Sequence, residues 1–171
     1  GEKMKLIEAM KKLKDLNIKA EDLRKKVSVH CADLSFETPM YPDQASVVSG
    51  WIQAHSDLMQ EILKLRVGIQ RTNLKTLVAI ELGGKSVSKT ISEWIHRRRD
   101  LAKLDMDMWS KLGDRGLAEQ SGKDSQGQQV DIKIRRYFDP KVRDEKIDLY
   151  RSEPSVIDAT LEVVNAVTEL E

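Results

Sequence analysis

The chain has 171 residues, of which 33% are charged and 5% aromatic, and its formal net charge is +1. This length fits one domain, and the even charge balance argues against a nucleic-acid-binding protein and against an acidic tail protein. A single cysteine excludes an intramolecular disulfide. The sequence has neither a run of about 18 apolar residues nor the pattern of a signal peptide, so we expect a cytoplasmic protein that does not enter a membrane.

Two long helices are predicted in the first half of the chain. Apolar residues recur at alternating steps of three and four over 3–34, which places them on one helix face. A similar stripe predicts a second helix over 43–72, and Pro39 and Pro42 place a turn between the two. Their similar lengths and short connection favour an antiparallel hairpin. The first stripe consists of Leu6, Ala9, Leu13, Leu16, Ala20, Leu23, Val27, His30 and Leu34.

The middle of the chain changes its period. A Gly-Gly pair at 83–84 separates two short extended runs, which predicts a β-hairpin over 74–88, with a flexible loop as the alternative. A third helix is expected to begin at Thr90, because Thr90 and Glu93 have the spacing of a capping box, and to end near Gly113. Its predicted inward residues are Ile91, Trp94, Ile95, Leu101, Leu104, Met108 and Leu112.

The last third combines a loop, a strand and a helix. Residues 117–129 are rich in Gly, Ser and Gln without an apolar period, which predicts a mobile loop. Alternating apolar and charged residues predict a strand over 130–138, which can join the hairpin in a small three-stranded sheet. Asp139 and Pro140 have the chemistry of a helix start, and Pro154 predicts either a kink or two abutting helices.

The predicted fold class is therefore mainly α. We expect an elongated antiparallel bundle of about four long helices with a small β-hairpin or three-stranded sheet inserted, in a single helical domain over 1–171. Helices this long with so few aromatic residues leave apolar surface uncovered in a monomer. A homo-oligomer formed through helix faces is expected for that reason.

No catalytic or metal-binding signature stands out. The run Gly83-Gly84-Lys85-Ser86 is similar to the end of a phosphate-binding loop, but Ala79 stands where that loop needs its first glycine. His30 and Cys31 are adjacent, yet they lie on different faces of one helix, which does not suit a zinc site. We therefore predict a protein that is not an enzyme and that holds no metal and no cofactor.

The densest positive cluster spans His96 to Arg99. Arg98 falls on or beside the apolar stripe, so its charge needs a carboxylate or a bound anion. Internal salt bridges to neighbouring aspartates are one interpretation, and binding of a phosphate-containing ligand is the other. The candidate ligand-binding residues, which would have to converge at one end of the bundle, are Arg71, Asn73, His96, Arg98, Arg99 and Arg136.

Four short motifs carry a resemblance to a known family. They are Lys5-Leu6-Ile7-Glu8-Ala9, Ile69-Gln70-Arg71-Thr72-Asn73, Arg99-Asp100-Leu101 and Val130-Asp131-Ile132-Lys133-Ile134. In this order they resemble a family of uncharacterised bacterial helical proteins, some of which are labelled septicolysin-like. The resemblance implies a helical, oligomeric protein and brings no established activity and no catalytic residues. The label also implies membrane lysis, which nothing in the composition supports.

The leading hypothesis is a non-enzymatic oligomeric interaction or structural protein that works through helix surfaces, with an association to a phage or prophage. The alternative is a module that binds or sequesters an anionic ligand, a nucleotide or phosphate, with the arginine cluster between helices or subunits. An enzyme of unrecognised type is the third hypothesis, and it requires a deep pocket with a strongly perturbed carboxylate or histidine.

Overall fold

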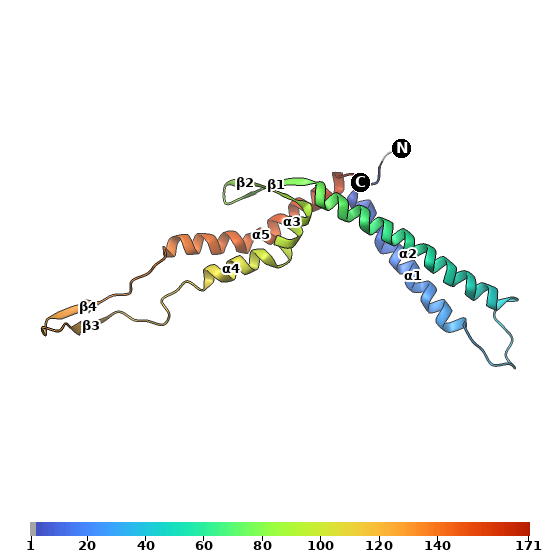
Figure 1. The fold of residues 1–171 in the computed structure, drawn as a ribbon, viewed down its shortest axis with the longest axis horizontal. Helices are drawn as coiled ribbons and strands as arrows, with labels where there is room; N and C mark the ends of the chain where they lie inside the picture. Colours follow the sequence, from blue (N-terminus) through green and yellow to red (C-terminus); the bar gives the residue numbers. More distant parts are fainter. Residues whose placement is uncertain (1–2) are drawn as a thin grey trace. The chain divides into compact units, whose positions relative to one another are not determined.

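The structure is a computed structural model that describes residues 3–171 (Figure 1). It is mainly helical, with two small antiparallel hairpins. The sequence predicted one domain, whereas the described residues group into two compact units. Unit 1 contains the residues up to Thr76 together with Leu161–Glu171, and unit 2 is Leu77–Thr160. No helix among the described residues carries an apolar run long enough to cross a membrane.

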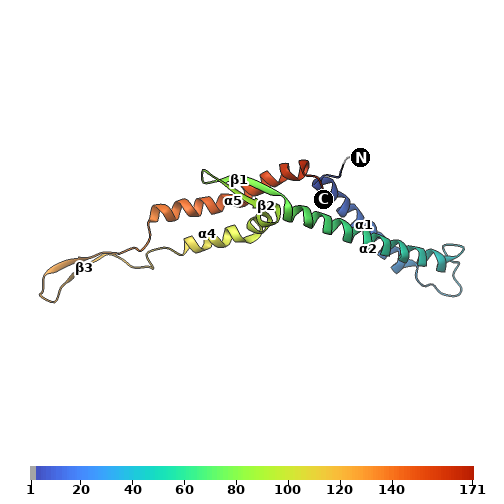
Figure 2. The same ribbon diagram turned by 45° about the horizontal axis from the view of Figure 1, so that its top comes forward.

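Unit 1 is built on a pair of long helices. α1 (Leu6–His30) and α2 (Gln44–Lys75) lie side by side and antiparallel, as Figures 1 and 2 both show. The predicted helical hairpin is confirmed. α1 begins three residues later and ends four residues earlier than the predicted 3–34, and α2 begins one residue later and ends three residues later than the predicted 43–72. The buried residues of α1 come from the predicted stripe and are Leu6, Ala9, Leu16 and Ala20.

The two ends of the chain meet in unit 1. The backbone amide of Leu6 donates a hydrogen bond to the carbonyl of Thr168 at 2.8 Å. The amide of Glu171 donates to the hydroxyl of Thr72 at 2.9 Å, and that hydroxyl donates to the carbonyl of Gly68. Thr72 is buried, and both hydrogen-bonding roles of its hydroxyl are therefore satisfied.

The predicted β-hairpin begins unit 2. β1 (Leu77–Leu82) pairs antiparallel with β2 (Lys85–Thr90). Gly83 and Gly84, the two residues between the strands, have φ of 59° and 77°. Positive φ at both central positions is the requirement of a type I′ turn, which glycine meets without steric cost. The hairpin is thus fixed by its turn, and the flexible-loop alternative is wrong.

The predicted third helix is present but is not uniform. α3 (Ile91–His96) begins with the expected capping box, in which the Thr90 hydroxyl accepts from the Glu93 amide and the Glu93 carboxylate accepts from the Thr90 amide. A π-helical segment, η1 (Arg97–Leu101), follows, and then α4 (Ala102–Ser110). The long third helix that the apolar period predicted is therefore interrupted by a wider turn.

The terminal helix, α5 (Pro140–Val167), runs through Pro154 without a break. The Asp139 carboxylate accepts from the Lys141 amide at 2.9 Å, which confirms the predicted helix start. A proline within a helix removes one backbone hydrogen bond, but neighbouring turns can hold the helix together. The predicted alternative of two abutting helices at Pro154 is therefore wrong.

The predicted three-stranded sheet is wrong. β4 (Gln129–Ile132) pairs with β3 (Gln120–Lys123) and not with the β1–β2 hairpin. β3 lies within 117–129, which was predicted to be a loop, and the strand predicted over 130–138 ends at Ile132. Three helices are long, and the fourth is the interrupted α3–η1–α4 run. Their assembly into one four-helix bundle stays a prediction.

Candidate functional site

Arg97 makes more hydrogen bonds to carboxylates than the other arginines of the cluster. Its Nε and Nη2 atoms both donate to the Glu153 carboxylate at 2.8 Å, and Nη1 donates to Asp105 at 2.7 Å. The side chains of Arg97 and Glu153 are 18% and 3% exposed. The hydrogen bonds from Arg97 to Glu153, reinforced by the charges of both carboxylates, raise the pKa of Arg97 despite its burial. Arg97 is therefore held by two internal salt bridges, to Asp105 nearby in the sequence and to the distant Glu153.

The predicted Arg98, Arg99 and His96 are more exposed and have separate partners. Arg98 donates to Asp158 of α5 at 3.0 Å, and Arg99 donates to the Nδ1 atom of His96 at 2.7 Å. The side chain of Arg97, 18% exposed, lies further inward than that of Arg98, which is 37% exposed.

The remaining candidates lie elsewhere. Arg71 and Asn73 belong to α2 in unit 1, and Arg136 belongs to the segment before α5 in unit 2. Arg136 donates two hydrogen bonds to Asp114, at 2.7 and 2.8 Å. Each arginine of the predicted set that lies in unit 2 is thus held by another side chain of the protein.

A basic pocket that sequence reasoning missed surrounds Arg136. It has a volume of about 310 Å³ and is formed by the loop after α4 and the segment before α5. Asp114, the acidic side chain of its lining, is already paired with Arg136. The basic residues of the lining are Lys111, Arg115, Arg135 and Arg136.

The helix end beside this pocket gives the positive charge there a structural explanation as well. Carbonyl groups at the C-terminus of a helix attract cations. Arg143 donates to the carbonyl of Leu112, just beyond α4, at 3.1 Å.

Arg115 has a φ of 56° and is the one non-glycine residue with positive φ in the described part of the chain. The Arg135-Arg136 pair and the basic residues around Gly113 were the signal for this pocket in the sequence.

The Asp114–Arg136 ion pair is expected to make the stability of the protein depend on pH. Hydrogen bonds from Arg136 lower the pKa of Asp114 below its ordinary value. Because the pKa is lower in the folded state, the stabilisation is present above the unfolded pKa of about 3.9 and is lost as pH falls through the folded pKa. We expect Arg136→Gln to return the pKa of Asp114 towards its ordinary value, as measured by NMR titration of the carboxyl carbon. An unchanged titration would show that the pair is not formed in solution.

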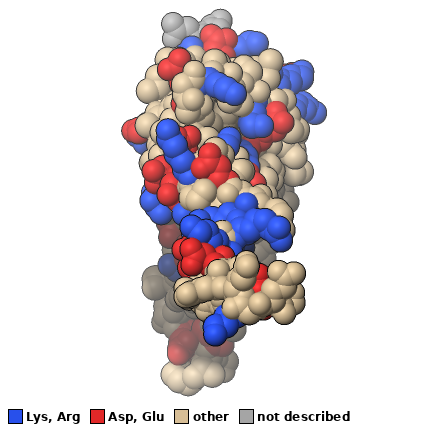
Figure 3. Space-filling model, turned by 90° about the vertical axis from the view of Figure 1, so that its left-hand side faces the viewer, with Lys and Arg blue, Asp and Glu red and all other residues tan. Residues whose placement is uncertain are grey.

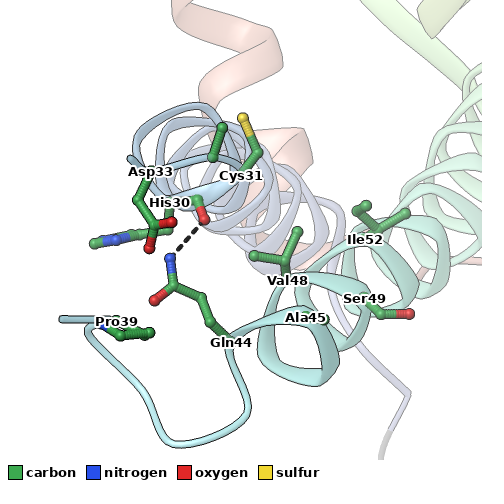
Figure 4. A pocket seen from close by; sticks show the side chains of 10 residues that line it. His30, Cys31, Asp33, Pro39, Gln44, Ala45, Val48, Ser49 and Ile52 are labelled. Atoms are coloured by element: carbon green, nitrogen blue, oxygen red, sulfur yellow. Dashed lines mark hydrogen bonds between the residues drawn. The ribbon is translucent and has the colours of Figure 1, made fainter. Parts of the chain in front are cut away.

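A second pocket, of about 540 Å³, lies where α1 and α2 are connected (Figure 4). The Gln44 side chain donates to the carbonyl of His30 at 2.8 Å and closes the end of α1. The rings of His30, Tyr41 and Trp51 are 5.6–5.9 Å apart. Cys31 is exposed at the rim.

Within residues 3–171, no group of three or more His, Cys, Asp or Glu side chains is placed to hold a metal ion.

Four exposed apolar residues of α2 form a stripe along the helix. Ile52, Met59, Leu63 and Leu74, here called the α2 stripe, are 56%, 37%, 64% and 55% exposed. At 100° per residue these four positions fall within about 60° of the helix circumference. Ile62, which is buried, lies on a different side of the same helix. α2 therefore buries one side in unit 1 and exposes four apolar residues on another.

Figure 3 shows basic and acidic side chains interspersed over the face that it draws. The formal net charge of the chain is +1.

The comparisons with known proteins bear on the fold alone. No family model and no curated protein matches the sequence. The crystal structure of a functionally unknown conserved protein from Corynebacterium diphtheriae is similar to this one, with a TM-score of 0.58. The similarity covers 99% of this chain and 100% of that chain at 19% sequence identity. The two chains share a fold over their whole length.

Proposed function

We propose that this protein is a non-enzymatic homo-oligomer that works through its helix faces, in an interaction or structural role. The observation that carries the proposal is the α2 stripe, an exposed apolar face on a well-formed helix. Soluble monomers rarely leave large contiguous apolar patches in water, and such patches commonly mark protein interaction sites.

Light scattering of the purified protein at micromolar concentration tests the proposal. We expect a mass of two or more chains, and a monomer under these conditions would contradict it. Further predictions belong to this proposal. They are an elongated bundle of about four long helices in the chain, a cytoplasmic location, a phage or prophage association and a relationship to septicolysin-like proteins.

Binding of an anion is the second candidate, and the basic pocket around Arg136 is the observation that favours it. Lys111 and Arg135 contribute charge there without an acidic partner within 4.0 Å among the described residues. We expect inorganic phosphate or ATP to raise the melting temperature more than chloride of equal ionic strength does. The double variant Lys111→Gln, Arg135→Gln should lose this increase, and an increase that persists in the variant would place binding elsewhere.

A further inference from the structure

Two cavities of unit 2 adjoin at Arg135 and Tyr137. The first is the basic pocket around Arg136, and the second, of about 300 Å³, reaches Gln120 and Ile132 at the base of the β3–β4 hairpin. Arg135 and Tyr137 belong to the lining of both cavities, and the Arg135 guanidinium lies 5.7 Å from the centre of the Tyr137 ring. Each cavity has a volume at the lower end of the range of ligand sites, which runs from about 300 to 1,000 Å³.

Tyr137 presents an aromatic ring to solvent where the two cavities adjoin. The residue is 87% exposed, so its ring adds little to the packing of the fold. Arg135 lies over one face of the ring, and at this exposure the opposite face is open to solvent. An open aromatic face can stack on a planar ring of a ligand, and a guanidinium beside it can pair with an anionic group of the same ligand.

Three cations of the basic pocket have no acidic partner within 4.0 Å among the described residues. They are Lys111, Arg115 and Arg135, here called the three unpaired cations. Asp114, the acidic side chain of the same lining, accepts two hydrogen bonds from Arg136, so its charge is already neutralised. The pocket therefore keeps positive charge that an anion with several negative charges can neutralise.

We propose that the two cavities bind a free nucleoside polyphosphate, with its phosphates at the three unpaired cations and its base stacked on Tyr137. This inference rests on the second candidate function, the binding of an anion, and names the class of ligand. A polyphosphate chain matches three cations better than a single phosphate group, which carries about two negative charges at most. The base accounts for the exposed aromatic ring, which an inorganic anion would leave unused.

The hairpin beyond this junction favours a single nucleotide over a nucleic acid strand. A further cavity along the hairpin has Glu119 and Asp131 in its lining, with Lys133 as its basic residue. The charge of Glu119 also acts on Arg136 of the basic pocket. A polymer needs positive charge at successive phosphates, and these carboxylates would repel its backbone.

Isothermal titration calorimetry of the full chain with ATP and with inorganic tripolyphosphate tests the inference. Tyr137→Ala should lower the affinity for ATP on the order of tenfold, the contribution of one stacked base, and leave the affinity for tripolyphosphate unchanged. Tyr137→Phe should bind both ligands as the wild type does, because the ring face makes the contact. Lys111→Gln should lower both affinities. Phe36→Ala removes a ring that is 83% exposed in unit 1, and this matched control should change neither affinity.

The outcomes separate the ligand class from the anion site. If Tyr137→Ala left the ratio of the two affinities unchanged while Lys111→Gln lowered both, the inference would be overturned and the anion site would stand. Absence of binding by ATP and by tripolyphosphate would overturn both. Tighter binding of a ten-residue oligothymidylate than of ATP would overturn the choice of a free nucleotide. Circular dichroism of each variant verifies that it remains helical.

Discussion

Replacing Arg97 with methionine is expected to lower the free energy of unfolding by about 3–5 kcal/mol. The variant leaves the Glu153 carboxylate, whose side chain is 3% exposed, without the guanidinium that donates both of its close hydrogen bonds. An unpaired buried charge is among the costliest defects in a folded protein. Urea denaturation followed by circular dichroism measures the loss.

Two further variants separate the pair from its surroundings. Adding Glu153→Leu to Arg97→Met should restore most of the stability, because a buried ion pair can often be exchanged for apolar side chains at little cost. Arg98→Met is the matched control. Its partner Asp158 is largely exposed, so we expect a loss below about 1 kcal/mol. Equal losses for Arg97→Met and Arg98→Met would contradict the burial argument.

The helices of unit 1 could be predicted because their apolar period is local. The three-four spacing of Leu6, Leu16 and Ala20 already specifies which face of α1 is buried. The turn at Gly83-Gly84 could be predicted for a similar reason, since two consecutive residues with positive φ require a particular residue type.

The inward face of the third helix could not be predicted beyond its first turns. Leu101, Leu104 and Met108 were expected inside but are exposed. The π-helical segment inserts one extra residue, so each inward position moves one residue further along the chain. Ala102 is accordingly buried where Leu101 was expected. A fixed period of 3.6 residues cannot show this shift.

The β3–β4 hairpin escaped prediction because its strands bury no apolar face. Its pairing depends on backbone hydrogen bonds and on its turn. The Asp124 carboxylate accepts from the amides of Gln126 and Gln128, and Gly127 has a φ of 79°. An aspartate followed three residues later by glycine was the available signal.

The candidate site was predicted only in part for a related reason. A sequence shows that an arginine needs a partner but not which carboxylate the fold brings to it. Arg97 and Arg98 are paired with Glu153 and Asp158, which lie far away in the sequence on α5. Those contacts depend on the tertiary packing of unit 2, which local spacing does not encode.

Trp94 is the second position at which a large effect is expected. Its side chain is fully buried, and its Nε1 atom donates to the carbonyl of Val78 in β1 at 2.9 Å. Trp94→Ala removes the largest buried side chain of the protein and should cost about 3–5 kcal/mol. The contact connects the first turn of α3 to the hairpin, so this loss falls on the packing of unit 2.

Trp94→Phe separates the hydrogen bond from the packing. Phenylalanine keeps most of the apolar volume but leaves the Val78 carbonyl without its indole donor, which should cost about 1–3 kcal/mol. Urea denaturation of both variants measures the two losses, with the half-buried Trp109→Phe as the control for removing an indole elsewhere. If Trp94→Phe were as stable as the wild type, the indole hydrogen bond would contribute nothing, and shape alone would hold β1 against α3.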